Sequence, residues 1–418
     1  MKCGPTIPIN NHGQRIRNGI EPKLNRPRTL DNMPIERNGR TSEYSELDGM
    51  FGVDEAIEVQ KDKLKALREQ VRKLAFRKID MAGSYSSITY KAFDGGKMGI
   101  RFIPFEINVV DVADSNGKRR VRFVVPEISG FENDNEVRED VLDELDKIPE
   151  IKKLYTLLGQ KSIRDISHLL IDSNNLMEIS EWACIFDRLT ADNQEPIIIL
   201  KDGLLRTKVI KADGKNNYVR ALREIVKQNK ENAKLVGVSK TSNIVSLLST
   251  ALFLEKKIPP DSIGFVKIPL ELELKAYQWT GKGSARVDTK NPNPLYYAFG
   301  ELYIAKLAKN SNLLVTIEVP KDLESGEGIY SEEEINDILS HLAKDSKYSY
   351  PVIGYPQTIM RAHETAVRLG FPASILRDEL RDKIFESLGD KDAKEFIRDA
   401  WLLMDTVDKG VLGGGQSG

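Results

Sequence analysis

The stretch that decides the fold is "EPIIILKDGLL", residues 195–205. Four large aliphatic residues, Ile197 to Leu200, stand in a row and are followed by a turn at Asp202 and Gly203. A short run that is apolar on both faces is typical of a strand buried on both sides of a sheet. Ligands bind at the carboxyl ends of strands in open α/β sheets, and Asp202 stands at such an end. The structural alternative is an Asp that caps the following turn.

Outward from this strand, the pattern predicts a mixed central sheet flanked by helices. Three strand-like runs separated by Gly, Asp and Asn turns precede it, at residues 76–93, 99–112 and 118–128. A second buried strand, "AKLVGVSKTS", covers 233–242. Meander strands followed by β-α-β-α indicate the α/β class. Further strands are expected at 262–274, 284–290, 294–308 and 312–320, and helices at 54–77, 132–190, 215–233, 241–254, 331–344 and 357–369.

The bulk composition excludes several classes of protein. At 418 residues, with 40% hydrophobic and 30% charged residues, the chain has the composition of a soluble protein. No apolar run reaches the roughly 20 residues of a membrane span, and two cysteines are too few for a disulfide scaffold, so a cytoplasmic protein is expected. The net charge of −1 gives no global attraction to nucleic acid. No GxxxxGK[ST] phosphate loop occurs, so any ATP hydrolysis must come from a partner.

Composition also divides the chain. Residues 1–50 are polar and rich in Asn, Arg, Pro and Gly, and predict a flexible arm. The central domain is expected over 51–370, with a helical insertion at about 132–175. Helices are expected at 371–408, and the Gly-rich residues 409–418 predict a flexible tail.

Three carboxylates are candidates for a metal site. Asp80 ends the apolar part of the first strand-like run, and Asp202 ends the buried strand. Glu178 and Glu181 lie one turn apart on a helix that leads into the Asp202 strand, and their spacing leaves both as candidates. Oxygen ligands of this kind suit Mg²⁺ or Mn²⁺. Two such ions would stabilise the attacking and leaving oxygens of phosphodiester cleavage.

The stretch "GYPQTIMRAHETAVRL", residues 354–369, supplies a tyrosine and a histidine. His363 lies within an apolar helical stripe, eight residues after Tyr355 at the helix start. A neutral imidazole ligates a metal or moves a proton near neutral pH, and the tyrosine can position a phosphate or a water. The structural alternatives are a core histidine and a simple Gly-Tyr-Pro turn.

Together these stretches resemble the NurA nuclease family, the partners of HerA-type hexameric DNA translocases. The resemblance runs over about 75–370 and rests on "IILKDGLL", "LVGVSKTS", "VTIEVP" and the step from Tyr355 to His363. It implies an RNase H-like fold, a homodimer and a Mn²⁺-dependent nuclease, with Mg²⁺ as the alternative ion, acting on DNA ends fed by the translocase. It further implies that the metal-binding and catalytic residues are Asp80, Glu181, Asp202 and His363, with Tyr355 catalytic and Lys240 and Arg361 binding substrate.

One departure from the family pattern concerns the first motif. The family usually has Asp-Gly-Ser there, whereas this chain has Asp80-Met-Ala82-Gly83-Ser84. If Gly83 and Ser84 align, the family Asp falls on Ala82, and Asp80 lies two residues earlier on the same strand face. A non-catalytic adaptor that docks DNA on the translocase is therefore the second hypothesis, and an RNase H-like enzyme acting on RNA is the third. DNA repair and defence against foreign DNA both fit the translocase partnership.

Overall fold

The computed structural model describes residues 53–367, except 82–87, 103–104, 129–133, 168–169, 171, 194, 208, 214–215, 278–297, 323–325 and 327, and five residues beyond them, 378, 379, 382, 383 and 386. The predicted arm at 1–50, the strand at 284–290, nearly all of 371–408 and the tail at 409–418 lie outside the described residues. The chain divides into two compact units, 1–59 and 60–418. Of the first unit only residues 53–59 are described, and they begin helix α1 (Val53–Arg72).

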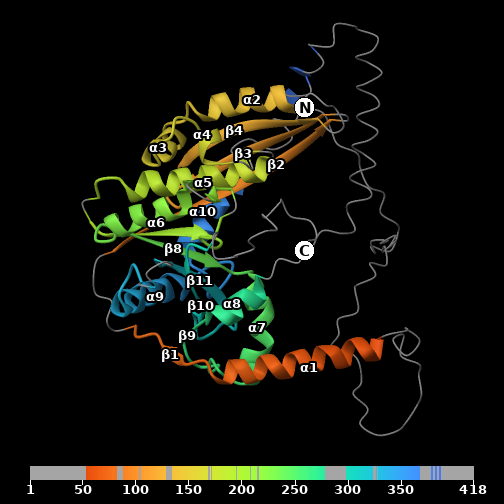
Figure 1. Cartoon of the computed structure of the whole chain (residues 1–418), viewed down its shortest axis with the longest axis vertical. Coiled ribbons are helices and arrows are strands. Elements are labelled where there is room, and N and C mark those ends of the chain that lie inside the picture. The colour runs from red at the N-terminus through yellow and green to blue at the C-terminus, as the bar shows by residue number, and fades with distance from the viewer. Residues whose placement is uncertain are drawn as a thin grey trace, which may run out of the picture. The chain divides into compact units, whose positions relative to one another are not determined.

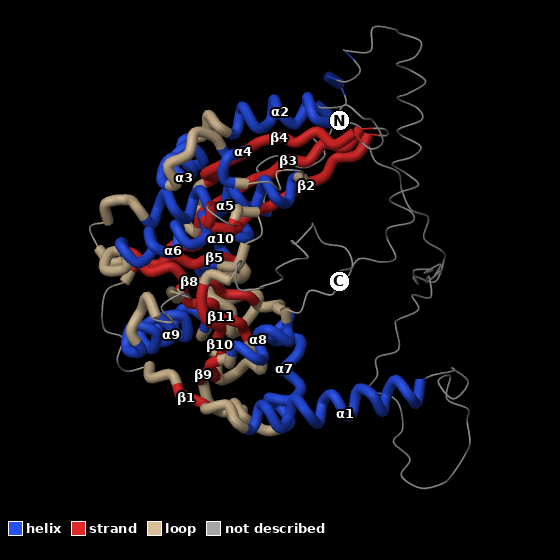
Figure 2. Tube along the Cα trace, in the orientation of Figure 1, coloured by secondary structure: helices blue, strands red, loops and turns tan. Residues whose placement is uncertain are grey.

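Within the described residues, nine strands form one mixed sheet (Figures 1 and 2). Their bounds are β1 Phe76–Lys78, β2 Thr89–Phe102, β3 Phe105–Asp114, β4 Arg119–Ile128, β5 Ile197–Asp202, β8 Ala233–Ser239, β9 Gly264–Lys267, β10 Gly300–Lys306 and β11 Val315–Pro320. The order across the sheet is β1-β9-β10-β11-β8-β5-β2-β3-β4. Strand β5 pairs in parallel with both β2 and β8, and the other neighbours are antiparallel. The α/β fold with a mixed central sheet is confirmed.

Helices lie on both faces of this sheet (Figure 1). Besides α1 they are α2 Asp134–Leu145, α3 Pro149–Leu157, α4 Ile163–Ile166, α5 Ser173–Leu189, α6 Tyr218–Asn229, α7 Asn243–Leu254, α8 Leu270–Ala276, α9 Glu332–Ser346 and α10 Gln357–Val367. A short hairpin of β6 (Ala212–Asp213) and β7 (Asn216–Asn217) precedes α6. None of the described helices is long and apolar enough to cross a membrane.

Strand β2 separates the two helices that matter for the site. A Cβ on Gly95 would lie 2.5 Å from Met177 Cγ of α5, whereas a Cβ on Gly96 would lie 2.4 Å from the Ala366 carbonyl oxygen of α10. Neighbouring residues of a strand point to opposite faces of the sheet. Helices α5 and α10 therefore pack on opposite faces of β2, and glycine allows both to approach closely.

The predicted burial of β5 is confirmed. Ile197, Ile198, Ile199 and Leu200 are at most 1% exposed. Burying each such side chain contributes about 1.5–3 kcal/mol. The chain turns at Gly203, whose φ of +92° is a conformation that favours glycine. Its N–H donates to the Val238 carbonyl oxygen of β8 at 2.8 Å, which fixes the strand end that carries Asp202.

Two expectations about strands are wrong. Residues 76–93 are not one strand, because β1 pairs with β9 at one edge of the sheet while β2 begins at Thr89, beside β5. Residues 262–274 are not one strand either, because β9 ends at Lys267 and α8 begins at Leu270. Pro269 precedes α8 with φ −64°, which suits a helix start, and the Leu-Glu alternation that follows only imitates the period of a strand.

Candidate functional site

The site begins with the parallel pairing of β2 and β5. The register pairs Phe93 with Lys201, so Asp94 and Asp202 come next on their two strands. Residues paired in parallel strands point to the same face, and here that is the face covered by α10. Asp94 is 7% exposed, and Asp202 is somewhat less buried at the strand end. Two carboxylates therefore lie side by side where β5 ends.

Helix α10 brings an imidazole to these carboxylates. His363 Nδ1 lies 2.7 Å from Asp94 Oδ2, and the helix is held to the sheet by its buried residues Ile359, Ala362 and Ala366. One ligand atom each from Asp94, Asp202 and His363 lie within 4.8 Å of one another. We call these three residues the acid–histidine group. The two carboxylates supply the oxygen ligands that Mn²⁺ and Mg²⁺ take, and the imidazole adds a nitrogen ligand of the kind that transition metals accept.

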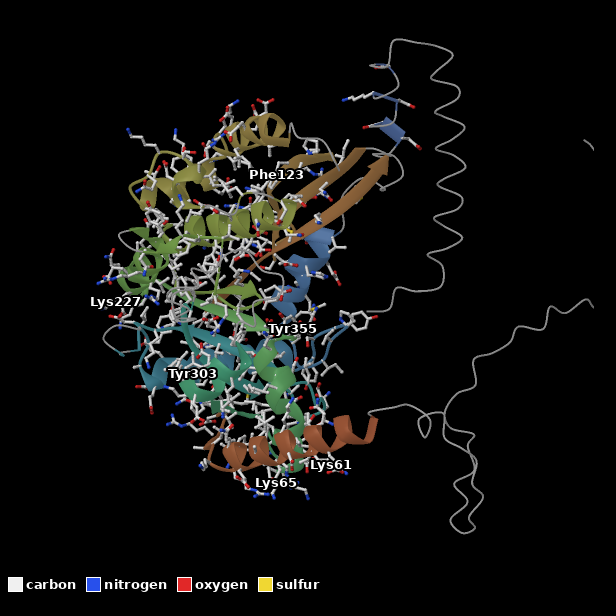
Figure 3. All side chains as sticks on the ribbon, turned by 45° about the vertical axis from the view of Figure 1, so that its right-hand side comes forward. Lys61, Lys65, Phe123, Lys227, Tyr303 and Tyr355 are labelled. Atoms are coloured by element: carbon white, nitrogen blue, oxygen red, sulfur yellow. The ribbon has the colours of Figure 1, made fainter. Side chains whose placement is uncertain are left out.

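Tyr355 and Lys240 complete the surroundings of Asp202. The Tyr355 hydroxyl lies 2.5 Å from Asp202 Oδ1 and 2.9 Å from the Val238 carbonyl oxygen, and its side chain is fully buried (Figure 3). Lys240 follows β8, and its Nζ lies 5.5 Å from the centre of the Tyr355 ring. The structure thus brings Asp202, Tyr355, His363 and Lys240 together, although they come from three separate parts of the sequence.

Burial and the interactions within the group raise two pKa values. Burial raises the pKa of Asp202, and the negative charge of Asp94 raises it further, against the hydrogen bond from Tyr355. The hydrogen bond with Asp94 raises the pKa of His363, against partial burial. In both residues the charge of Asp94 contributes to the upward shift. A cation placed among the three side chains would relieve the repulsion between the carboxylates, so these residues fit a divalent metal ion.

Glu181 lies next to the acid–histidine group but outside it. Its Oε2 is 2.8 Å from Lys201 Nζ, and both side chains are 8% exposed. Burial raises the pKa of Glu181 to about 7, although the nearby ammonium opposes the shift. Burial alone would lower the pKa of Lys201, but the charges of Glu181, Glu178 and Asp202 and the hydrogen bond to Glu181 together outweigh burial and raise it. Glu178, the other acid predicted from this helix, is half-buried and pairs with neither residue in any hydrogen bond that the described residues show.

The structure does not bring Asp80 to this group. Asp80 follows β1, and four strands, β9, β10, β11 and β8, separate β1 from β5. Asp80 is exposed, and its backbone carbonyl accepts a hydrogen bond from Ser340 Oγ at 2.7 Å. Arg361, predicted to bind substrate, is exposed on α10, and its charge acts on Asp345.

Asp94 is the residue that sequence reasoning missed. It stands in "FDGGK", residues 93–97, where Asp-Gly follows an alternating run that is now seen to be β2. This text matches the Asp-Gly part of the expected first motif better than Asp80-Met-Ala82 does. The signal was therefore present, but only the pairing of β2 with β5 distinguishes Asp94 from other Asp-Gly pairs.

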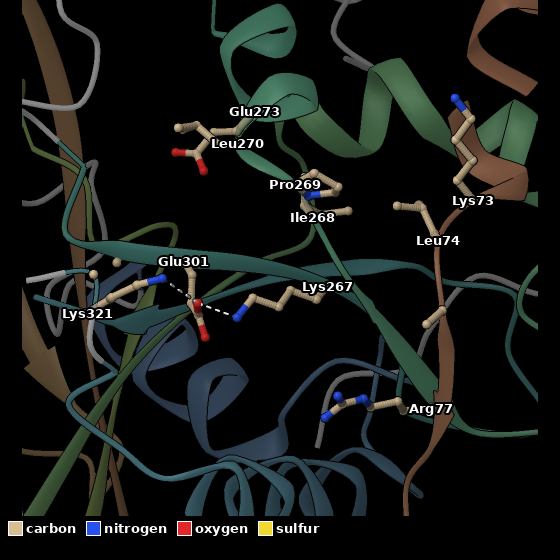
Figure 4. Close-up of a pocket in the computed structure, with 13 residues that line it drawn as sticks. Lys73, Leu74, Arg77, Lys267, Ile268, Pro269, Leu270, Glu273, Glu301 and Lys321 are labelled. Atoms are coloured by element: carbon tan, nitrogen blue, oxygen red, sulfur yellow. Dashed lines mark hydrogen bonds and ion pairs between the residues drawn. The ribbon is translucent and has the colours of Figure 1, made fainter. Parts of the chain in front are cut away.

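A separate pocket of about 520 Å³ lies at the β9–β10 side of the sheet (Figure 4). No member of the acid–histidine group lines it. Glu301 there pairs with Lys267 at 2.6 Å and with Lys321 at 3.4 Å. Because its central charges neutralise one another, the described residues that line this pocket offer no comparable cluster of metal ligands.

The chain is a mixed α/β protein in which a group of candidate metal ligands lies at the end of a buried parallel strand. The NurA domain model matches residues 109–368, more than half of the chain, and the chain belongs to the NurA domain family. The described strands form the mixed central sheet that the predicted RNase H-like fold requires. The match begins after Asp94, so Asp80 and Asp94 both lie before the matched residues. No curated protein matches the chain.

Several solved structures are similar to the chain. The NurA nuclease from Sulfolobus solfataricus is 15% identical with a TM-score of 0.41, and the comparison covers 81% of this chain and 96% of that one. A NurA bound to dAMP and manganese is 11% identical with a TM-score of 0.40, over 82% and 98%. Endonuclease V from Ciona intestinalis is 14% identical with a TM-score of 0.22, over 75% and 96%. Likenesses at this level concern the fold alone.

Proposed function

We propose that the chain is a divalent-metal-dependent DNA nuclease that hydrolyses phosphodiester bonds at DNA ends. The observation that carries the proposal is the parallel register of β2 and β5, which sets Asp94 beside Asp202 under His363. Membership of the NurA domain family supports the same activity. The resemblance seen in the sequence adds a HerA-type translocase as partner and a homodimer as the working form, in resection of DNA ends or defence.

In this proposal Asp94, Asp202 and His363 hold a Mn²⁺ or Mg²⁺ ion. Such an ion supplies a nucleophile from coordinated water and stabilises charge on the phosphoryl oxygens. The hydrogen bond between His363 Nδ1 and Asp94 orients the imidazole so that Nε2 is its free nitrogen. The Tyr355 hydroxyl holds Asp202 in place, and Lys240 supplies positive charge for a phosphate beside the Tyr355 ring.

The test is cleavage of end-labelled linear DNA by the full chain with Mn²⁺, with and without the translocase. Asp94→Asn and Asp202→Asn should each lower the rate by about 10²–10⁴-fold, because the loss of one anionic ligand removes several kcal/mol of transition-state stabilisation. The matched control is Asp80→Asn, which should keep the wild-type rate because Asp80 is not a member of the acid–histidine group.

The other outcomes separate the competing hypotheses. Binding of DNA without cleavage, under all of these conditions, would support the adaptor instead. Cleavage of RNA in preference to DNA would support the third hypothesis. Loss of cleavage in Asp80→Asn, with Asp94→Asn unaffected, would return the first ligand to the position predicted from the sequence.

A further inference from the structure

We propose that the Lys201 ammonium is a built-in second cation of this site, so that each chain takes up one divalent ion rather than the two that the sequence suggested. The ion would bind to Asp94, Asp202 and His363, and Lys201 would hold Glu181 away from it. The inference rests on the proposed metal-dependent function and specifies how that site is charged.

The position of the ammonium carries the argument. Lys201 Nζ lies 2.8 Å from Glu181 Oε2 and 3.1 Å from the backbone carbonyl oxygen of Asp202. A carboxylate and a backbone carbonyl are the oxygen ligands that hard divalent cations use. The ammonium thus occupies a cation position made by Glu181 and the residue that carries the metal-binding carboxylate.

The surroundings hold Lys201 and Glu181 in this arrangement. Both side chains are 8% exposed, so neither charge is free to turn into water. Glu181 Oε1 lies only 2.6 Å from where a Cβ on Gly95 would be, so the carboxylate packs on the backbone of β2. Glu181 has one oxygen against this backbone and the other on Lys201. It therefore touches the strand of Asp94 without joining the acid–histidine group.

Electrostatic repulsion opposes a second divalent ion at Glu181 and the Asp202 carbonyl, where the Lys201 ammonium lies. Two cations a few ångströms apart repel strongly in a buried site, where the effective dielectric constant is low. The further acids that the described residues place near this part of β2 are Glu181, Glu178 and Asp111. Lys201 already neutralises Glu181, and Arg119 and Arg122 pair with Asp111. The result is a site with one exchangeable divalent ion and one fixed positive charge, the ammonium of Lys201. Lys201 is a positioning residue in this scheme, because it acts through Glu181 and the Asp202 backbone.

Counting bound Mn²⁺ on the metal-free full chain tests the inference, by electron paramagnetic resonance of the free ion together with calorimetric titration. Neither readout requires DNA or cleavage. The wild type should bind one Mn²⁺ per chain. Lys201→Met should bind two, because Glu181 becomes available as a ligand. Lys201→Arg keeps the charge and should bind one. The matched control is Lys97→Met, an exposed lysine on β2 whose Nζ lies 3.3 Å from Ser173 Oγ, and it should also bind one.

A double variant guards against misfolding. Lys201→Met leaves Glu181 as an unpaired buried charge, which is destabilising, whereas Lys201→Met with Glu181→Gln removes both charges. The double variant should bind one Mn²⁺, and circular dichroism checks that each variant is folded. Two ions on the wild type, or one on a folded Lys201→Met, would overturn the inference and leave the proposed function standing. No ion on the wild type would overturn both.

Discussion

Two carboxylates at neighbouring positions of paired strands are costly unless something neutralises them. In this structure the pKa of Asp202 is raised, and its carboxylate accepts a hydrogen bond from the Tyr355 hydroxyl. The Asp94 carboxylate forms a hydrogen bond with His363. Each of these interactions predicts a dependence of metal binding or stability on pH or on a single substitution. The behaviour of single residues therefore reports on the whole site.

His363 should make metal binding depend on pH. The hydrogen bond with Asp94 raises its pKa from the ordinary 6.5, and a protonated imidazole does not ligate a metal. Below the raised pKa, Mn²⁺ affinity should fall roughly tenfold per pH unit, because one proton must be displaced for each ion bound. Titrations of Mn²⁺ between pH 5.5 and 8.5 measure this slope, and His363→Asn should flatten it. An equal slope in both proteins would contradict the role of His363.

The same group has the opposite effect on the metal-free fold. A folded-state pKa raised above the unfolded value gives a stabilisation that is fully present below the unfolded pKa of 6.5 and is lost as the pH rises through the folded value. Without metal, the wild type should therefore lose more stability than His363→Asn between pH 6 and 8. Urea unfolding with a chelator present measures the difference.

Removing the Tyr355 hydroxyl should loosen Asp202. Tyr355→Phe leaves the ring buried but takes away the donor 2.5 Å from Asp202 Oδ1. The net loss of a hydrogen bond to a charged group is about 1.5–3 kcal/mol, measured by urea unfolding. Mn²⁺ affinity should fall as well, because Asp202 loses its orientation. The control is Tyr350→Phe, since the Tyr350 side chain is 77% exposed, and its stability should not change.

At the scale of elements, the contact between α10 and β2 decides whether His363 meets Asp94. A Cβ on Gly96 would lie 2.4 Å from the backbone carbonyl oxygen of Ala366, so this contact has no room for a side chain. Backbone, unlike the end of a flexible side chain, cannot move aside without shifting the helix. Glycine at this position is therefore a condition for the site.

Gly96→Ala should push α10 away from the sheet. Forcing a methyl group into a packed contact costs about 1–3 kcal/mol of stability. Mn²⁺ affinity should fall by more than this loss of stability explains, because His363 moves with the helix. Thermal unfolding and Mn²⁺ titration together measure both effects. Lys97→Ala is the neighbouring control, and unchanged Mn²⁺ affinity in Gly96→Ala would show that the helix position does not matter.

The elements also show what the sequence can and cannot predict. The buried strands β5 and β8 follow from their aliphatic runs, and α10 follows from its apolar spacing, because burial on both faces or on one stripe leaves a local pattern. The candidate site residues Asp202 and His363 lie on β5 and α10, and Tyr355 lies two residues before α10. The prediction of a single strand at 76–93 is wrong because no local pattern shows that the two ends of this segment pair with different strands. Asp94 was missed for the same reason, since strand pairing is a long-range property.

At the scale of the whole molecule, a second buried charge cluster supports the sheet next to the site. Glu318 of β11 is fully buried and accepts hydrogen bonds from the backbone N–H groups of Arg206, Phe299 and Gly300 at 3.1, 3.1 and 3.2 Å. Arg206 also pairs with Glu273 at 2.9 Å. This cluster joins the segment after β5 to β10 and β11, so it ties the strand of Asp202 to the far half of the sheet.

Arg206→Met should destabilise the whole fold. It leaves the buried Glu318 and Glu273 without their counter-charge, which costs about 3–5 kcal/mol when one partner of a buried pair is removed. Urea unfolding measures the loss. The matched control is Arg77→Met, which breaks only the exposed pair with Glu332 and should cost at most about 1 kcal/mol. Equal losses in the two variants would show that the Glu318 cluster contributes no more than a surface ion pair.

The wide sequence separation of the site residues has a consequence for the newly made chain. His363 meets Asp94 across 269 residues, and Tyr355 meets Asp202 across 153. Loops of this length close late, since contacts distant in sequence form slowly and synthesis proceeds from the N-terminus. A ribosome-bound fragment that ends before Tyr355 has both aspartates but neither the histidine nor the tyrosine. If the proposed function holds, a cell carries no active DNA-cutting intermediate while the chain before α10 is being made, because α10 completes the site.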